Sequence, residues 1–144
     1  MTDKDGTDKD GTDKDGTDKD GTNKNGTDKD GQIENIEKYI KAALSRKAEN
    51  IIAIDVRELT SYADAIIIIT GRSGRQVTSI AEHIQITMKK EKKPPIGFEG
   101  VKLGTWALLD FGDVIIHVFD KKTRELYDIE GLWSDAPRID LSKF

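Results

Sequence analysis

Few side chains in this 144-residue sequence could carry out catalysis, and their spacing matches no complete catalytic motif. The chain has no cysteine and two histidines, His83 and His117, which excludes a thiolate nucleophile, a disulfide and a histidine-rich zinc site. Gly71–Gly74 joins an apolar run to an expected helix start, an arrangement that binds phosphate in other proteins. It lacks the spacing of a Walker loop or a dinucleotide fingerprint, and Arg75 stands where a nucleophile elbow needs glycine. A nucleotide-binding or nucleotidyltransferase-type enzyme using this loop is therefore the alternative function.

The acidic residues do not predict a metal site. Asp110 and Asp113 lie three positions apart across an expected turn, whereas acids at alternate strand positions would share one face. Residues 2–31 repeat Thr-Asp-Lys-Asp-Gly six times, with Asn23 and Asn25 replacing aspartate in the fifth copy. An EF-hand loop needs glycine at its sixth position and glutamate at its twelfth, and the repeat fails this match in every register. We expect no metal, no cofactor and no catalytic residue.

The most informative stretch runs from Gly104 to Asp120 and predicts a β-hairpin. Two runs rich in β-branched and apolar residues flank Gly112-Asp113, which is typical of a type II′ turn with glycine at the first central position. This turn fixes the register, so the opposed pairs should be Phe111 with Val114, Asp110 with Ile115, Leu108 with His117, and Trp106 with Phe119. One face should lie on the core because it is wholly apolar: Ala107, Leu109, Phe111, Val114, Ile116 and Val118.

The other face of the hairpin, which we call the mixed face, carries Trp106, Leu108, Asp110, Ile115, His117 and Phe119. It has too many large apolar groups for a plain solvent face, and it has an aspartate and a histidine that a sealed core would leave unpaired. Two interpretations stand side by side: a second helical layer covers this face, or a partner protein does. In the second case Trp106 is the anchor for the partner.

Apolar periodicity predicts an α/β fold, a small mixed β-sheet with helices packed on it. The expected elements are a helix over 33–47, strands over 51–57 and 64–70, a helix over 73–91, the hairpin over 105–119 and a helix over 124–133. The apolar stripe of the long helix is Val77, Ile80, Ala81, Ile84 and Met88. Ser73 and Gln76 should form a capping box at its start. We expect the strands over 64–70 and 105–111 to be parallel, joined by a right-handed helical crossover.

The last predicted helix has a less regular pattern. Thr123 is its expected N-cap, and Leu126, Ile129 and Trp133 are expected to face the core. Gly131 lies inside it and costs about 1 kcal/mol relative to alanine.

The first 31 residues differ in composition from the rest. They have no apolar side chain after Met1, so we expect a disordered tail over residues 1–31 and a domain over 32–144. The tail holds six lysines and ten aspartates, which accounts for the whole net charge of −4, and the domain holds 17 groups of each sign. The domain therefore lacks the basic excess of a dedicated nucleic-acid-binding protein. Deleting residues 2–31 should leave thermal stability nearly unchanged.

One basic cluster occurs in the domain, Lys89, Lys90, Lys92 and Lys93. A solvated helix end that suits the helix dipole is the simpler interpretation, and a weak phosphate contact is the alternative. No apolar run approaches the roughly 20 residues of a membrane span. The N-terminus resembles neither a secretory signal nor an acid-poor transit peptide, so we expect a cytoplasmic protein with no membrane contact.

A series of motifs in this order resembles the ribosomal silencing factor family, also called RsfS or Iojap-like proteins. The motifs are Asp64–Gly71, Ser73–Val77, Glu99-Gly100, Trp106–Phe119, and Arg124 with Tyr127–Trp133. The resemblance implies a fold related to the nucleotidyltransferases but without catalytic residues. Ala65 departs from the family, which often has an aromatic residue there, and Gly131 replaces a usual long polar residue.

The resemblance also implies a function. Family members bind the large ribosomal subunit at ribosomal protein L-fourteen, prevent joining of the small subunit and lower translation when nutrients are scarce. Their tryptophan and neighbouring strand residues dock on the partner, which here implies Trp106, Leu108 and Asp110. His117 and Phe119 share that face and complete the expected partner-binding site. A minor ribosomal RNA contact from the lysine cluster and a homodimer of the free protein are further expectations.

Overall fold

The computed structural model describes residues 25–144, with side chains from Gly31 onward. The chain divides into two units after Asn35, and the described part of each is treated by itself. Helix α1 (Asn25–Ser45) begins within the repeat, eight residues before the expected start at Ile33. Extending a formed helix gains one hydrogen bond per residue, whereas starting a helix is costly. The boundary at residue 31 is therefore a change in composition and not in secondary structure, and the expectation of disorder for 1–24 lies outside the described residues.

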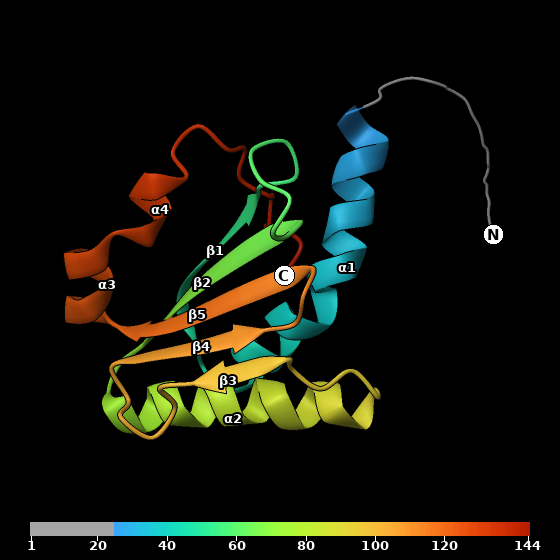
Figure 1. Ribbon diagram of the computed structural model, residues 1–144. Coiled ribbons are helices and arrows are strands. Elements are labelled where there is room, and N and C mark those ends of the chain that lie inside the picture. The colour runs from blue at the N-terminus through green and yellow to red at the C-terminus, as the bar shows by residue number, and fades with distance from the viewer. Residues whose placement is uncertain (1–24) are drawn as a thin grey trace. The chain divides into compact units, whose positions relative to one another are not determined.

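Residues 36–144 contain a five-stranded mixed sheet, which confirms the predicted fold class (Figure 1). Its strands are β1 (Glu49–Asp55), β2 (Ala65–Gly71), β3 (Gly97–Glu99), β4 (Trp106–Asp110) and β5 (Val114–Asp120). Their spatial order is β1-β2-β5-β4-β3, with β2 and β5 parallel and all other neighbours antiparallel.

The expected parallel relation between the strands over 64–70 and 105–111 is wrong. β4 is antiparallel to β5 and β5 is parallel to β2, so β4 and β2 run in opposite directions. After α2 (Gly74–Lys90) the chain forms β3 at the sheet edge, returns as β4 and turns at Gly112 before β5 enters between β4 and β2. β5 is the longer of the two hairpin strands and can pair along its length with β2, which suits an inner position. β3 has three residues, too few for a period of two to be visible in the sequence.

One face of the sheet is packed against α2 and the residues of α1 from Ile36 onward. The predicted stripe of α2 is buried in full, and Ser73 caps this helix by accepting a hydrogen bond from the backbone N–H of Gln76 at 3.2 Å. Within α1, Ile36, Tyr39 and Ile40 are buried, and the Tyr39 ring lies 4.8 Å from that of Phe111. All seven residues of β2 are buried, as expected for a strand covered on both faces.

The opposite face of the sheet is covered in part by two short helices, α3 (Lys121–Tyr127) and α4 (Ile129–Leu132). One helix over 124–133 was expected, but Asp128 adopts a left-handed conformation with φ of 46° and separates the two. Asp120, and not Thr123, caps α3 by accepting a hydrogen bond from the Thr123 N–H at 2.8 Å. Leu126 is 75% exposed, so its predicted core position is wrong. No helix of residues 25–144 is long and apolar enough to span a membrane.

Candidate partner-binding face

The hairpin that carries the mixed face has the register predicted from its turn. Trp106 is paired with Phe119, Leu108 with His117 and Asp110 with Ile115. Gly112 has a φ of +91°, and the Phe111 N–H donates to the Val114 carbonyl at 2.9 Å, as a two-residue turn requires. Every residue of the apolar face is at most 5% exposed. The side chains of the mixed face therefore point away from α2.

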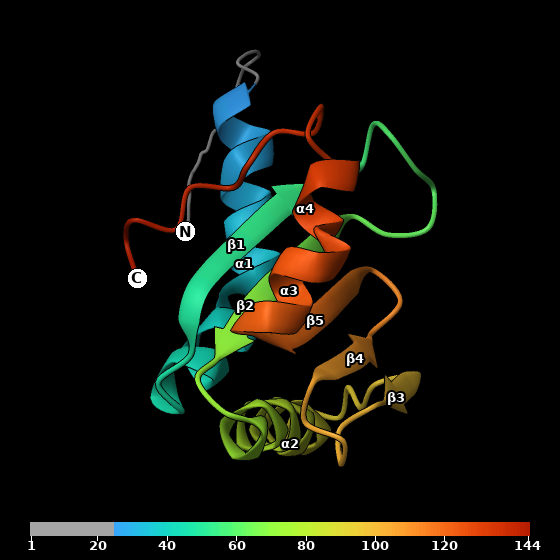
Figure 2. The same ribbon diagram turned by 90° about the vertical axis from the view of Figure 1, so that its left-hand side faces the viewer.

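Helices α3 and α4 cover only part of the mixed face. Figure 2 shows them in front of β1, β2 and β5, while β4 and β3 lie beside them and are not covered by them. A second apolar cluster fills the space beneath the helices: Ile54, Val56, Ala63, Ile66, Ile68, Phe119 and Ala136. Of the mixed-face residues, Trp106, Leu108, Asp110, Ile115 and His117 are half-buried, and Phe119 is fully buried. A helical layer therefore covers the β5 side of this face, and the β4 side is open.

Trp106 lies at the border between the covered and the open part. Its ring centroid is 5.0 Å from that of Phe119 and 4.7 Å from that of Tyr127 in α3. Its indole Nε1–H donates to Nδ1 of His117 at 3.0 Å, across the β4–β5 pair. Trp106 is thus held in one orientation by the chain itself, although part of its surface remains exposed.

His117 contributes as a neutral acceptor. Burial lowers its pKa from 6.5 to about 4, because the imidazolium form would lose its hydration in this site. At neutral pH the ring therefore keeps a free lone pair on Nδ1, which accepts the indole hydrogen bond. Its ring stacks at 5.8 Å on Phe119, two residues along the same face.

Two of the predicted site residues have structural tasks. Asp110 accepts a hydrogen bond from the Gly112 N–H at 2.8 Å, so one carboxylate oxygen stabilises the hairpin turn. Phe119 has 0% exposure and belongs to the second cluster, so it cannot contact a partner in this conformation. Phe119 packs beneath the Trp106 ring. The hairpin register alone could not predict its burial, because the helix that covers Phe119 comes after the hairpin in the chain.

The role of Arg124 was not predicted from the sequence. Arg124 is 8% exposed and its guanidinium donates to the Asn50 carbonyl at 2.6 Å, to Thr70 Oγ1 at 2.7 Å and to the Glu130 carboxylate at 3.0 Å. The planar fork of five donors matches this divergent set of acceptors. Arg124 thereby ties α3 and α4 to β1 and β2 and fixes how far the helices reach over the mixed face. Its place in a family motif was the only signal for it.

The loop over Gly71–Gly74, the basis of the alternative function, is explained by packing. A Cβ on Gly71 would lie 2.9 Å from the backbone nitrogen of Val77, so the start of α2 requires glycine here. Gly74 packs against Gly104, whose own Cβ would lie 2.8 Å from the Gly74 Cα. Among the residues that the structure describes, no three histidine or acidic side chains gather as a metal site would require. No observation at this loop favours nucleotidyl transfer.

The lysine cluster divides into two parts. Lys89 and Lys90 are exposed in the last turn of α2, and Lys92 follows the helix, also exposed. Lys93 instead pairs with Asp113 at 3.2 Å, and its ammonium lies 5.8 Å from the centre of the Tyr39 ring. Lys93 is therefore committed to the fold, and only the other three remain candidates for a phosphate contact.

These features define a small α/β domain. Helices cover only part of one face of its sheet, and the ring of Trp106 is held in place beside the uncovered strand β4. A family model described as "Ribosomal silencing factor during starvation" matches residues 29–144, and the chain belongs to this family. The protein named ribosomal silencing factor RsfS from Chromobacterium violaceum is 40% identical over 103 residues, 71% of this chain and 84% of that protein. The protein of the same name from Halalkalibacterium halodurans is 33% identical, over 75% of this chain and 92% of its own length.

Solved structures agree with the fold. A crystal structure of a Chromobacterium violaceum protein has a TM-score of 0.68 at 40% identity, covering 71% of this chain and 86% of that one. Plant proteins named Iojap also match, which confirms the family predicted from the motifs. The bacterial relatives are named ribosomal silencing factors.

Proposed function

We propose that this chain binds the large ribosomal subunit through the open part of its mixed face, at ribosomal protein L-fourteen. By covering that surface in the cytoplasm it blocks joining of the small subunit and represses translation when nutrients are limiting. The observation that carries the proposal is the position of Trp106, half-buried beside an open β4 strand and held from three sides by the chain.

The chemistry of the open part suits a protein partner. Trp106 and Leu108 offer apolar surface, and Asp110 adds a polar group at its margin, the composition typical of the centre and rim of an interface. Aromatic anchors of this kind often carry most of the binding free energy. Because the indole is already fixed by His117 and Phe119, little side-chain entropy is lost on binding. We propose that the same face pairs two copies when the protein is free of the ribosome.

The test is co-sedimentation of the full chain with purified large and small subunits, each alone. Trp106→Ala is compared with Trp133→Ala, because both tryptophans are half-buried against the second cluster but only Trp106 borders the open part of the mixed face. We expect the parent and Trp133→Ala to pellet with large subunits only. Trp106→Ala should remain folded and bind roughly thirtyfold more weakly, the loss of about 2 kcal/mol at an interface anchor. Equal binding by the two variants would refute the proposed site.

A further inference from the structure

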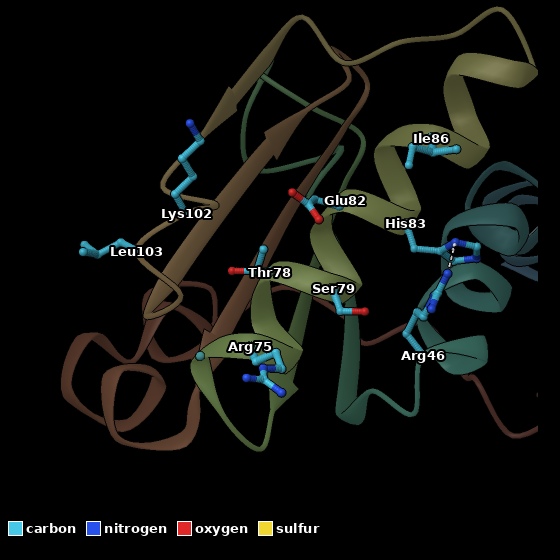
Figure 3. Close-up of a pocket in the computed structure, with 10 residues that line it drawn as sticks. Arg46, Arg75, Thr78, Ser79, Glu82, His83, Ile86, Lys102 and Leu103 are labelled. Carbon is cyan, nitrogen blue, oxygen red and sulfur yellow. Dashed lines mark hydrogen bonds between the residues drawn. The ribbon is translucent and has the colours of Figure 1, made fainter.

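An open groove of about 630 Å³ runs along the outer surface of α2 (Figure 3). Figure 3 shows α2 between two basic groups, with Lys102 on one side and Arg46 on the other, and Arg75 at the start of the helix. All three cations line the groove, and its single carboxylate belongs to Glu82. The groove thus carries a net positive charge on a domain whose total charge is zero.

Two of the three groove cations have no polar partner among the residues that the structure describes. Arg75 and Lys102 are exposed, and neither side chain forms an ion pair or hydrogen bond with any residue that the structure describes. Arg46 has a long contact of 3.4 Å with His83 Nδ1. Burial lowers the pKa of His83, and the charges of Arg46 and Lys90 lower it further, which reflects the positive potential here. By contrast, Arg72 outside the groove is paired with Glu49 at 3.3 Å.

The spacing of the charges indicates an extended anion. Arg75 and Lys90 are 15 residues apart in α2, and at 1.5 Å per residue they lie about 22 Å apart along its axis. Lys90 and Lys89 prolong the basic surface beyond the groove. A mononucleotide could reach only one end of such a surface. A polynucleotide backbone, with a phosphate at every step, could follow its whole length.

We propose that this groove binds the phosphodiester backbone of RNA, through Arg75, Lys102 and Arg46. If the proposed function holds, on which this second step rests, the RNA is a ribosomal RNA segment beside the protein surface that the mixed face covers. The mixed face then provides specificity and the groove adds a salt-dependent contribution to affinity.

The test measures the affinity of the full chain for large subunits between 0.05 and 0.5 M salt (about a tenfold range). Arg75→Gln/Lys102→Gln removes two groove cations. Lys41→Gln/Lys143→Gln is the matched control, because it removes two exposed cations that pair only with Glu37 on the surface. Each phosphate contact contributes about 0.7 to 0.9 to the slope of log affinity against log salt. The groove variant should therefore have a slope shallower by about 1.4 to 1.8 and lose roughly 25- to 60-fold at 0.1 M salt, whereas the control should match the parent.

Two further arms identify the ligand. Glu82→Gln removes the one carboxylate of the groove and should strengthen binding, an outcome that misfolding cannot produce. Labelled polyuridylate should bind the parent and Trp106→Ala equally and the groove variant weakly. If the groove variant binds subunits with the slope of the parent, the inference is wrong. It is also wrong if subunit binding needs the groove but polyuridylate binding does not, since the partner would then be an acidic protein surface. Failure of the parent to bind large subunits would refute the proposed function, and the polyuridylate arm would still test the groove.

Discussion

Leu108 and Leu109 are neighbours in β4 whose side chains point to opposite faces, so truncating each should affect a different property. Leu109 has 0% exposure, is paired with Ile116 and lies on the face that packs against α2. Leu108 is half-buried, is paired with His117 and lies in the open part of the mixed face. The two variants remove the same atoms from the same strand and differ only in the face.

The magnitudes follow from burial. Leu109→Ala leaves a cavity in a sealed core and should cost about 2–5 kcal/mol of unfolding free energy. At about 4 °C per kcal/mol for a domain near 110 residues, the melting temperature should fall by about 8–20 °C. Leu108→Ala exposes a half-buried site without a cavity and should cost about 1 kcal/mol, or about 4 °C.

Binding should show the opposite order. Leu108→Ala should weaken binding to the large subunit by fivefold or more, a loss of about 1 kcal/mol or greater at the interface. Leu109→Ala should bind like the parent at any temperature where it is folded. Circular dichroism melting and co-sedimentation at 10 °C measure the two properties on the same samples. If Leu109→Ala loses binding while folded and Leu108→Ala does not, the face assignment is wrong.

Arg124→Ala should lower the free energy of unfolding, measured in urea, by about 3 kcal/mol, because Glu130 loses its buried partner. Arg124→Lys should recover only part of this loss, since lysine lacks the planar fork of donors. A loss below about 1 kcal/mol would show that Arg124 does not tie α3 and α4 to the sheet. Acidification from pH 6.5 to 4 should destabilise the protein by up to about 3 kcal/mol, because the unfolded chain protonates His117 near its ordinary pKa whereas the folded state does so only near a pKa of about 4. His117→Gln should flatten this dependence, and equal pH profiles for variant and parent would show that His117 is not the group concerned. Gly100→Ala should cost more than about 2 kcal/mol, because its Cβ would lie 2.1 Å from the Trp106 carbonyl oxygen at a φ of +76°, and an unchanged melting temperature would disprove this close approach.

The hairpin was predictable in detail because its turn chemistry fixes a register and its strands alternate. A two-residue turn at Gly112-Asp113 determines every pair in β4 and β5, and the structure confirms each of them. The capped helix α2 was equally predictable, since Ser73, the apolar stripe and Pro94 define its start, its face and its end. These features are local, so nearby residues specify them.

What the sequence did not reveal depends on contacts distant along the chain. The order of strands depends on where β3 and β4 are placed after α2, and no local pattern records that β5 enters beside β2. The burial of Phe119 and the extent of the open face depend on α3, whose reach is set by Arg124 contacts with Asn50 and Thr70, more than 50 residues away. The basic groove likewise combines Arg46, Arg75 and Lys102 from three segments.

We propose that the chain keeps the subunits apart by covering the large one, and a subunit-joining assay measures this effect itself. Large subunits are incubated with the parent chain or with Trp106→Ala, small subunits are added, and joined ribosomes are measured on sucrose gradients. We expect the parent to lower the joined fraction in proportion to its occupancy of large subunits. Trp106→Ala should have little effect, and incubating the chain with small subunits should change nothing. If large subunits saturated with the parent chain join small subunits as completely as free ones do, the chain does not act by blocking subunit joining.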